Sequence, residues 1–241
     1  MKQITESLYQ ISLGAANVFL LTGDDGLTLV DTGLPGSADK LFAAVRKGGK
    51  RPEDITRIVL THWHPDHAGS AADLQQRLGA RVVAHAADAD ILEQGGGERP
   101  RYLTPGLVNR LVFRFFINGV SSQIPPISID ERVADNALIA TAGGLRVLHT
   151  PGHSAGHMAL LLEQEGVLIA GDICANVFGL AYSTVYEDIT LGQQSLLKVA
   201  AKPFDQAVFG HGGPVIRNAS QKLREKFEQP LDVAGKLLQT V

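Results

Sequence analysis

"LTHWHPDHAG", residues 60–69, decides how this 241-residue chain folds and what it can bind. It follows an apolar run and gathers His62, His64, Asp66 and His67 within six positions, although the whole chain has only eight histidines. On an extended segment, residues two apart point the same way, so His62 and His64 can share one ion. Pro65 begins a turn that directs Asp66 and His67 towards a neighbouring ion. Imidazole and carboxylate groups suit a borderline divalent metal such as zinc.

Three later stretches also end apolar runs in residues of these ligand types. They are "LHTPGHSAGH" (148–157), "LIAGDICA" (168–175) and "AVFGHGG" (207–213). Together with the first stretch they supply five histidines and two aspartates as candidates, which is enough for two adjacent cations. The alternative is a group of histidines that bind no metal, but burying so many unpaired polar groups would be costly.

The remaining pattern predicts strands and helices in both halves of the chain. Strands precede a helix in each half, which favours one α/β domain over residues 1–241, with two packed sheets, flanking helices and a helical insertion at about 95–126. Strands are expected near 6–12, 17–21, 27–31, 55–60, 81–85, 145–149, 158–163, 166–171 and 206–210, and helices near 37–47, 71–78, 190–201 and from 218.

Composition excludes several classes of function. A net charge of −3, with 44% hydrophobic and 20% charged residues, is ordinary for a soluble globular protein and gives no sign of nucleic-acid binding. No apolar run approaches a membrane span, and the first residues lack the layout of a signal peptide, so we expect a cytoplasmic protein without stable membrane insertion. The single cysteine, Cys174, excludes an internal disulfide. A small-molecule substrate is the expected partner, and a homodimer is left open.

The motifs occur in an order that resembles the metallo-β-lactamase-fold hydrolase superfamily, and its glyoxalase II-like and lactonase-like branch in particular. The resemblance runs from about residue 8 to 215 and rests on "DTG" (31–33), "HWHPDH" (62–67), "PGHSAGH" (151–157), "AGD" (170–172) and "GHGG" (210–213). It implies a four-layer αββα sandwich of two mixed β-sheets flanked by helices.

The resemblance also implies a dinuclear site. In it His62, His64 and His153 hold the first metal, Asp66, His67 and His211 hold the second, and Asp172 bridges the two. Asp31 would lie behind the histidines and orient them, and a supporting role is open for His157. Zinc is the first choice of metal by ligand type, with iron or manganese as alternatives.

Such a site implies a metal-dependent hydrolase that uses a metal-bridging hydroxide on a thioester, lactone or other activated ester, with Asp66 or Asp172 as the proton acceptor. The alternatives are an oxidoreductase similar to the mono-iron persulfide dioxygenases, or a β-lactam hydrolase. The complete second set favours hydrolysis over the iron enzyme, and zinc β-lactamases lack an aspartate equivalent to Asp172. Lactonases usually carry a tyrosine at the position of Ala175, so Tyr182 and Tyr186 are candidates for an oxyanion donor, with packing as the alternative.

The stretch 99–129 holds four arginines and no acidic residue. Within it, "LVNRLVFRFF" (107–116) predicts an apolar helix that carries Arg110 and Arg114 four positions apart. These arginines are candidates for binding an anionic group of the substrate. The alternative is a helix that covers the sheet or meets another subunit, with solvated arginines, and a peripheral membrane contact is a third possibility. We expect His85, His149 and Cys174 to be packing residues.

Overall fold

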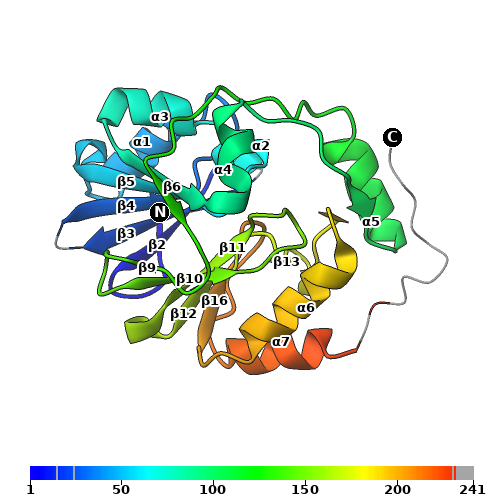
Figure 1. The fold of residues 1–241 in the computed structure, drawn as a ribbon. Coiled ribbons are helices and arrows are strands. Elements are labelled where there is room, and N and C mark those ends of the chain that lie inside the picture. The colour runs from blue at the N-terminus through cyan, green and yellow to red at the C-terminus, as the bar shows by residue number, and fades with distance from the viewer. Residues whose placement is uncertain (15, 24, 230, 232–241) are drawn as a thin grey trace.

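The computed structural model describes residues 1–14, 16–23, 25–229 and 231. Two β-sheets pack face to face, and helices cover their outer faces (Figure 1). The first sheet is mixed, because its early strands pair antiparallel and its later strands pair parallel. In spatial order it contains β1 (Lys2–Gln3), β2 (Leu8–Ser12), β3 (Asn17–Gly23), β4 (Gly26–Val30), β5 (Ile55–Leu60), β6 (Arg81–His85) and β8 (Glu131–Val133).

The second sheet is also mixed, since one of its four pairings is parallel. In spatial order it contains β16 (Gln206–Val208), β12 (Val167–Ile169), β11 (Met158–Leu162), β10 (Leu145–His149) and β9 (Leu138–Ile139). Two small ribbons accompany it. They pair β13 (Cys174–Asn176) with β14 (Leu180–Tyr182), and β15 (Val185–Tyr186) with β7 (Tyr102–Leu103).

Alternating side chains along the strands create the layers. In β3, Phe19 and Leu21 point into the core between the sheets, whereas Val18 and Leu20 point towards the outer helices. A strand buried on both faces needs apolar residues at every position, which is why its sequence reads as a continuous apolar run. The second sheet repeats this arrangement, with Leu160 facing the other sheet and Leu161 facing outward.

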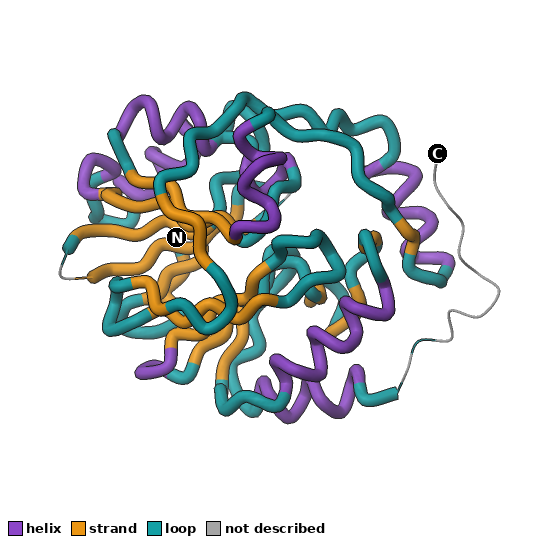
Figure 2. Tube along the Cα trace, in the orientation of Figure 1, coloured by secondary structure: helices purple, strands orange, loops and turns teal. Residues whose placement is uncertain are grey.

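Helices complete a four-layer αββα sandwich, as the sequence predicts (Figure 2). On the first sheet lie α1 (Ala38–Lys47), α3 (Ala71–Leu78) and α4 (Ala86–Glu93), and on the second lie α6 (Ile189–Ala200) and α7 (Ala219–Phe227). Single turns of helix occupy α2 (Pro65–Ala68), η1 (Pro52–Asp54) and η3 (Glu163–Glu165). None of the helices in the described part of the chain is long and apolar enough to cross a membrane.

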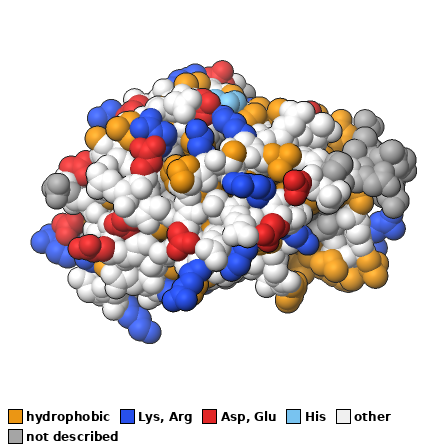
Figure 3. All heavy atoms as spheres, turned by 90° about the horizontal axis from the view of Figure 1, so that it is seen from below, with side chains coloured by type: hydrophobic (Ala, Val, Ile, Leu, Met, Phe, Trp, Pro, Cys, Tyr) orange, Lys and Arg blue, Asp and Glu red, His pale blue; other side chains and the backbone are white. Residues whose placement is uncertain are grey.

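The predicted insertion contains a helix, α5 (Leu107–Val112), which continues as a turn of π-helix, η2 (Phe113–Ile117). Its interpretation as a cover for a sheet is wrong, because no residue of either segment is buried. Leu107, Phe115 and Phe116 are 72%, 68% and 75% exposed. Hydrophobic side chains accordingly gather at the end of the molecule that carries α5 (Figure 3).

Candidate metal centre

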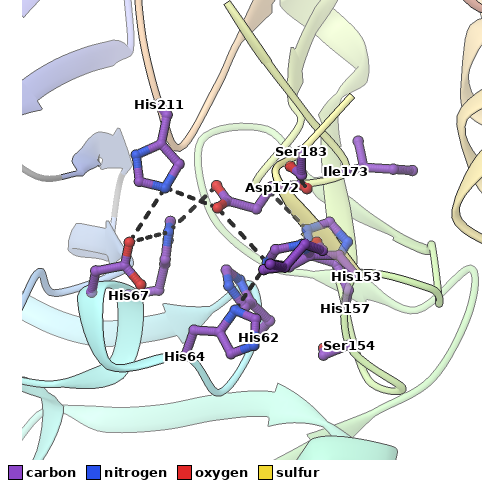
Figure 4. Close-up of polar contacts among 12 residues, drawn as sticks. His62, His64, His67, His153, Ser154, His157, Asp172, Ile173, Ser183 and His211 are labelled. Carbon is purple, nitrogen blue, oxygen red and sulfur yellow. Dashed lines mark hydrogen bonds and ion pairs between the residues drawn. The ribbon is translucent and has the colours of Figure 1, made fainter. Parts of the chain in front are cut away.

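The ligand-type residues of all four motifs meet where the two sheets end (Figure 4). The first sheet supplies its group from the segment after β5, and α2 begins within that segment. The second sheet supplies its group from the loops after β10, β12 and β16. Three groups of residues each bring their donor atoms within 4.8 Å of one another. The groups are His62, His64 and His153; His62, His67 and Asp172; and Asp66, His67 and His211.

The first set presents neutral imidazoles to one point. His153 Nδ1 donates to the carbonyl oxygen of Val185 at 2.9 Å, so the lone pair of its Nε2 is directed at His64 Nδ1, also 2.9 Å away. Burial holds the pKa of His62, His64 and His153 below the ordinary value, which keeps these rings uncharged. Lone pairs that converge at this distance repel one another unless a proton or a cation lies between them.

The second set combines imidazole with carboxylate. Asp66 Oδ2 lies 3.3 Å from His211 Nε2 and 3.6 Å from His67 Nε2. Asp66 is the more exposed of the two candidate aspartates, with a side chain that is 29% accessible against 7% for Asp172. The second set therefore opens to solvent through Asp66 and through His211, whose side chain is 28% accessible.

Asp172 lies between the two sets and faces both. Its Oδ2 is 2.9 Å from His211 Nε2 and 3.8 Å from His153 Nε2, and its Oδ1 is 3.4 Å from His67 Nε2. One carboxylate thus faces histidines of both sets, which is the arrangement expected for a bridging residue.

The electrostatics of the centre favour added positive charge. Burial alone would lower the pKa of His67 and His211, but the carboxylates of Asp172 and Asp66 outweigh it and raise the pKa of His67 well above its usual value and that of His211 to about 10. Burial would likewise raise the pKa of Asp172, but the nearby His211 and His67 hold it well below its usual range. The carboxylates therefore hold protons on these imidazoles that a metal ion would displace.

Three buried atoms test whether metal ions fit. His62 Nε2, His67 Nε2 and Asp172 Oδ1 are inaccessible and make no hydrogen bond of normal geometry, although the last two face each other at 3.4 Å. Buried polar atoms in proteins are rarely left unpaired, and all three atoms are good donors to zinc, iron or manganese. The residues present therefore fit two divalent ions that share Asp172.

Asp31 lies behind the histidines, as the family resemblance implies. Its carboxylate, fully buried, accepts from His67 Nδ1 at 2.8 Å and from Thr61, through both the backbone N–H and the hydroxyl, at 2.8 Å. Thr61 Oγ1 in turn contacts His62 Nδ1 at 3.0 Å. Both histidines consequently direct Nε2 into the centre. The φ of Asp31 is +62°, a left-handed conformation that a non-glycine residue adopts at a cost.

His157 supports the centre without being a ligand. Its Nε2 accepts from the backbone N–H of Asp172 at 2.9 Å, and its Nδ1 donates to Thr150 Oγ1 at 2.7 Å. Both ring nitrogens are therefore occupied. His157 fixes the backbone from which the shared carboxylate projects.

The structure contradicts the oxyanion role for one candidate tyrosine, Tyr186, and the role of Tyr182 stays a prediction. Tyr186 is 1% exposed, and its hydroxyl donates to Ile173 O at 2.6 Å and accepts from Ser183 N at 3.0 Å. Because its only hydroxyl proton is used in this way, the interpretation of Tyr186 as an oxyanion donor is wrong. Tyr182 packs its ring against Phe227 of α7, with centroids 4.7 Å apart, and belongs to the core beneath that helix.

Neither candidate arginine forms a hydrogen bond or ion pair with the ligand-type residues of the centre in the described part of the chain, so their substrate role stays a prediction. Arg110 and Arg114 are exposed on α5 and η2, and neither side chain forms a hydrogen bond or ion pair with another described residue. Cys174 is fully buried and packs beneath α6, and burial raises the pKa of its thiol far above its usual value. It is a packing residue, as expected.

Sequence reasoning missed several residues that hold the ligands in place. Thr61, which directly precedes the histidine motif, could have been found from that position alone. Asp88 and Glu187 could not, because they lie far along the chain from the loop that they contact, around His153.

Comparison with known proteins agrees with this geometry. The family model of the metallo-beta-lactamase superfamily matches residues 11–211. The chain is 30% identical to the lactamase-like protein aptB of Emericella nidulans over 88% of this chain and 56% of the relative, and 28% identical to the thioesterase pkgB of the same fungus over 91% and 52%. The chain thus spans little more than half the length of these fungal relatives.

Solved structures give the same fold. A metallo-beta-lactamase family protein from Thermus thermophilus superposes with a TM-score of 0.70 and 27% identity, covering 94% of this chain and 80% of its own. A beta-lactamase from Chitinophaga pinensis superposes with a TM-score of 0.72 at 22% identity, covering 94% and 89%, and supports the fold alone.

Proposed function

Because this chain belongs to the metallo-beta-lactamase superfamily, we propose that it is a hydrolase in which two divalent metal ions act on a thioester, lactone or other activated ester. The observation that carries the proposal is the place of Asp172, whose carboxylate oxygens face histidines of both donor sets. His62, His64 and His153 would hold the first ion and Asp66, His67 and His211 the second. Zinc is the first choice, because the donors are imidazole and carboxylate groups.

Two such ions, when bound, polarise a carbonyl oxygen and lower the pKa of water. The chain's own residues supply the orientation and the proton transfer. Asp31 and Val185 O fix the tautomers of His67 and His153, so that each directs Nε2 inward. Asp66, the more exposed carboxylate, is placed to accept a proton from attacking water at the mouth of the centre.

Among the substrate classes we place thioesters first. One relative, 28% identical over 91% of this chain, is named a thioesterase, and the chain's only thiol, Cys174, is buried and so does not offer a competing thiolate nucleophile. The net charge of −3 supports a small-molecule substrate over nucleic acid. The expected cytoplasmic location is part of the same proposal.

Metal analysis combined with a substrate panel tests the proposal. Protein purified without added metal should contain about two divalent ions per chain and should hydrolyse an acyl thioester or a lactone. Asp172→Ala should lose metal and almost all activity while its circular dichroism spectrum stays unchanged. A single iron with consumption of oxygen would indicate the oxidoreductase, and rapid turnover of β-lactams alone would indicate the β-lactamase.

A further inference from the structure

The loop at 151–157, which carries His153, is held from outside by a buried carboxylate. Asp88, in the first turn of α4, is 1% exposed. It accepts from Ser154 Oγ at 2.6 Å, from the backbone N–H of Gly156 at 2.9 Å and from an Arg99 guanidinium nitrogen at 2.8 Å. Two of these three donors lie on the loop of His153, so Asp88 holds that loop through Ser154 and Gly156, which follow His153 in the chain.

Gly156 shows how closely the loop approaches α4. A Cβ atom at this position would lie 2.5 Å from the backbone nitrogen of Asp88 and 2.6 Å from its carboxyl carbon. Real Cβ atoms do not approach other heavy atoms this closely. The absence of a side chain at Gly156 is thus what allows Asp88 to bond directly to the loop backbone.

Arg99 extends this contact to a second carboxylate. It lies near the start of the predicted insertion, and it donates to Ala87 O at 3.1 Å and to Glu187 Oε2 at 3.5 Å. Glu187 accepts from the backbone N–H of Ala155 at 2.8 Å and from Trp63 Nε1 at 3.1 Å. Trp63 lies between His62 and His64 in the chain, and Ala155 lies two residues after His153. The network therefore bonds to residues next to or near each histidine of the first set.

We propose that Asp88 and Arg99 are positioning residues for the first metal, an inference that rests on the proposed function only in taking that metal to be the ion at His62, His64 and His153. The Asp88–Arg99–Glu187 network holds the loop of His153 against the segment of His62 and His64. Removing the charge of Asp88 leaves Arg99 without its closest partner and weakens the bonds of Ser154 and Gly156. Asp66 and His67 of the second set have no direct bond to the network among the described residues.

Zinc affinity measured in two backgrounds separates positioning from general stability. His211→Ala removes a ligand from the second set alone, and His153→Ala removes one from the first. Adding Asp88→Asn should weaken zinc binding about 10–100-fold in the His211→Ala protein, as loss of an outer support typically does, and should leave the His153→Ala protein unchanged. Competition with a chromogenic chelator gives both dissociation constants.

The matched control lies on the same helix. Asp90 also pairs with an arginine, Arg132, at 2.7 Å, but on the exposed face of α4. Asp90→Asn should leave zinc affinity unchanged in both backgrounds. Equal weakening in both backgrounds, or none in the His211→Ala protein, overturns the inference.

A second variant covers the case in which Asp88→Asn does not fold. Arg99→Gln keeps both carboxylates in place, and the Arg99 side chain is 23% exposed. Arg99→Gln should weaken zinc binding in the His211→Ala protein but not in the His153→Ala protein, and Arg132→Gln is its control. Unchanged zinc affinity of Arg99→Gln in the His211→Ala protein contradicts the inference. Because the readout is zinc affinity, a protein that binds zinc as expected but cleaves no ester would contradict the proposed function and leave this inference standing.

Discussion

Asp31 shows how one side chain can act on a metal through others. Its carboxylate holds His67 directly and His62 through Thr61, and its backbone adopts φ +62° to do so. Asparagine tolerates the same left-handed backbone conformation. We predict that Asp31→Asn weakens metal binding about 10–100-fold, because the imidazole of His67 loses its charged partner. Zinc titration with a competing chelator measures the loss.

The size of the effect distinguishes support from ligation. Asp31→Asn should retain more metal than His67→Ala, which removes a donor outright. An Asp31→Asn protein with the affinity of the parent would limit Asp31 to a structural role, and one as poor as His67→Ala would argue that Asp31 itself contacts the metal.

His85 is a buried histidine that must stay neutral. Its Nδ1 accepts from the backbone N–H of Ala87 at the start of α4, and its ring stacks on His149 with centroids 3.9 Å apart. Burial, with help from His149, lowers its pKa from 6.5 to about 4. Between these values the unfolded chain binds a proton that the native protein does not, so the free energy of unfolding falls as the pH drops from 6.5 to 4.

We predict that His85→Asn, which can still accept at the helix start but cannot titrate, reduces this pH dependence. Urea unfolding of the metal-free proteins at several pH values between about 4 and 7 measures it. The two proteins should differ most in slope within that window and run parallel below about pH 4. Identical slopes throughout would mean that His85 titrates normally in the native state.

At the scale of elements, the loop after β16 shows where a glycine is required. A Cβ at Gly210 would lie 2.0 Å from Asp172 Oδ1 and 2.7 Å from His67 Cε1, whereas a Cβ at Gly213 would meet nothing within 4 Å. We predict that Gly210→Ala displaces the shared carboxylate and lowers both metal content and activity strongly, while Gly213→Ala has little effect. Metal analysis of the two variants, three residues apart in one loop, gives the comparison.

In the exposed α5 and η2 segment, large apolar side chains should contribute little to stability. Phe115 and Phe116 are largely exposed, so replacing both with serine should change the free energy of unfolding by less than about 0.5 kcal/mol for each substitution. Phe19, which is fully buried between the sheets, is the control, and Phe19→Ala should cost about 3–5 kcal/mol. Urea unfolding measures both, and a large loss in the serine variant would show that α5 is covered in solution.

Whether a strand or helix could be predicted from the sequence depends on whether its own residues carry the signal. The long strands and helices were predictable because burial leaves a continuous apolar run in β3 and a helical period of apolar residues in α1. The short strands β8, β9, β13, β14 and β15 were not, since they lie outside apolar runs like those that reveal the equally short β12 and β16, and they pair only when the fold brings partners together. Asp88 and Glu187 were missed because they contact a loop that is distant in the sequence. Tyr186 was a candidate oxyanion donor because its bond to Ile173 O cannot be read from the sequence either.

At the scale of the whole molecule, the candidate centre joins the two sheets at an end where hydrogen bonds such as that from Met158 N–H to Thr61 O, at 2.9 Å, also connect them. Another such contact is made by Asn17 of β3, whose side chain donates to Phe209 O at 3.0 Å and to Gly212 O at 2.8 Å, beside His211. The first sheet contributes His62, His64, Asp66 and His67 to the centre, and the second contributes His153, Asp172 and His211. Bound metal would therefore hold the sheets together as well as serve the chemistry.

Removing the metal should consequently destabilise the entire fold. An ion present at about 100 times its dissociation constant adds about 2.7 kcal/mol, and in a chain of this size each kcal/mol moves Tm by about 2–4 °C, so one site should contribute roughly 5–10 °C. Calorimetry of chelator-treated protein, with zinc added back in steps, measures the shift. Asp172→Ala should respond less to zinc, because the ligand facing both sets is gone, whereas Asp90→Asn should respond as the parent does. A Tm that zinc does not raise would contradict the view that metal binds the native state at the junction of the two sheets.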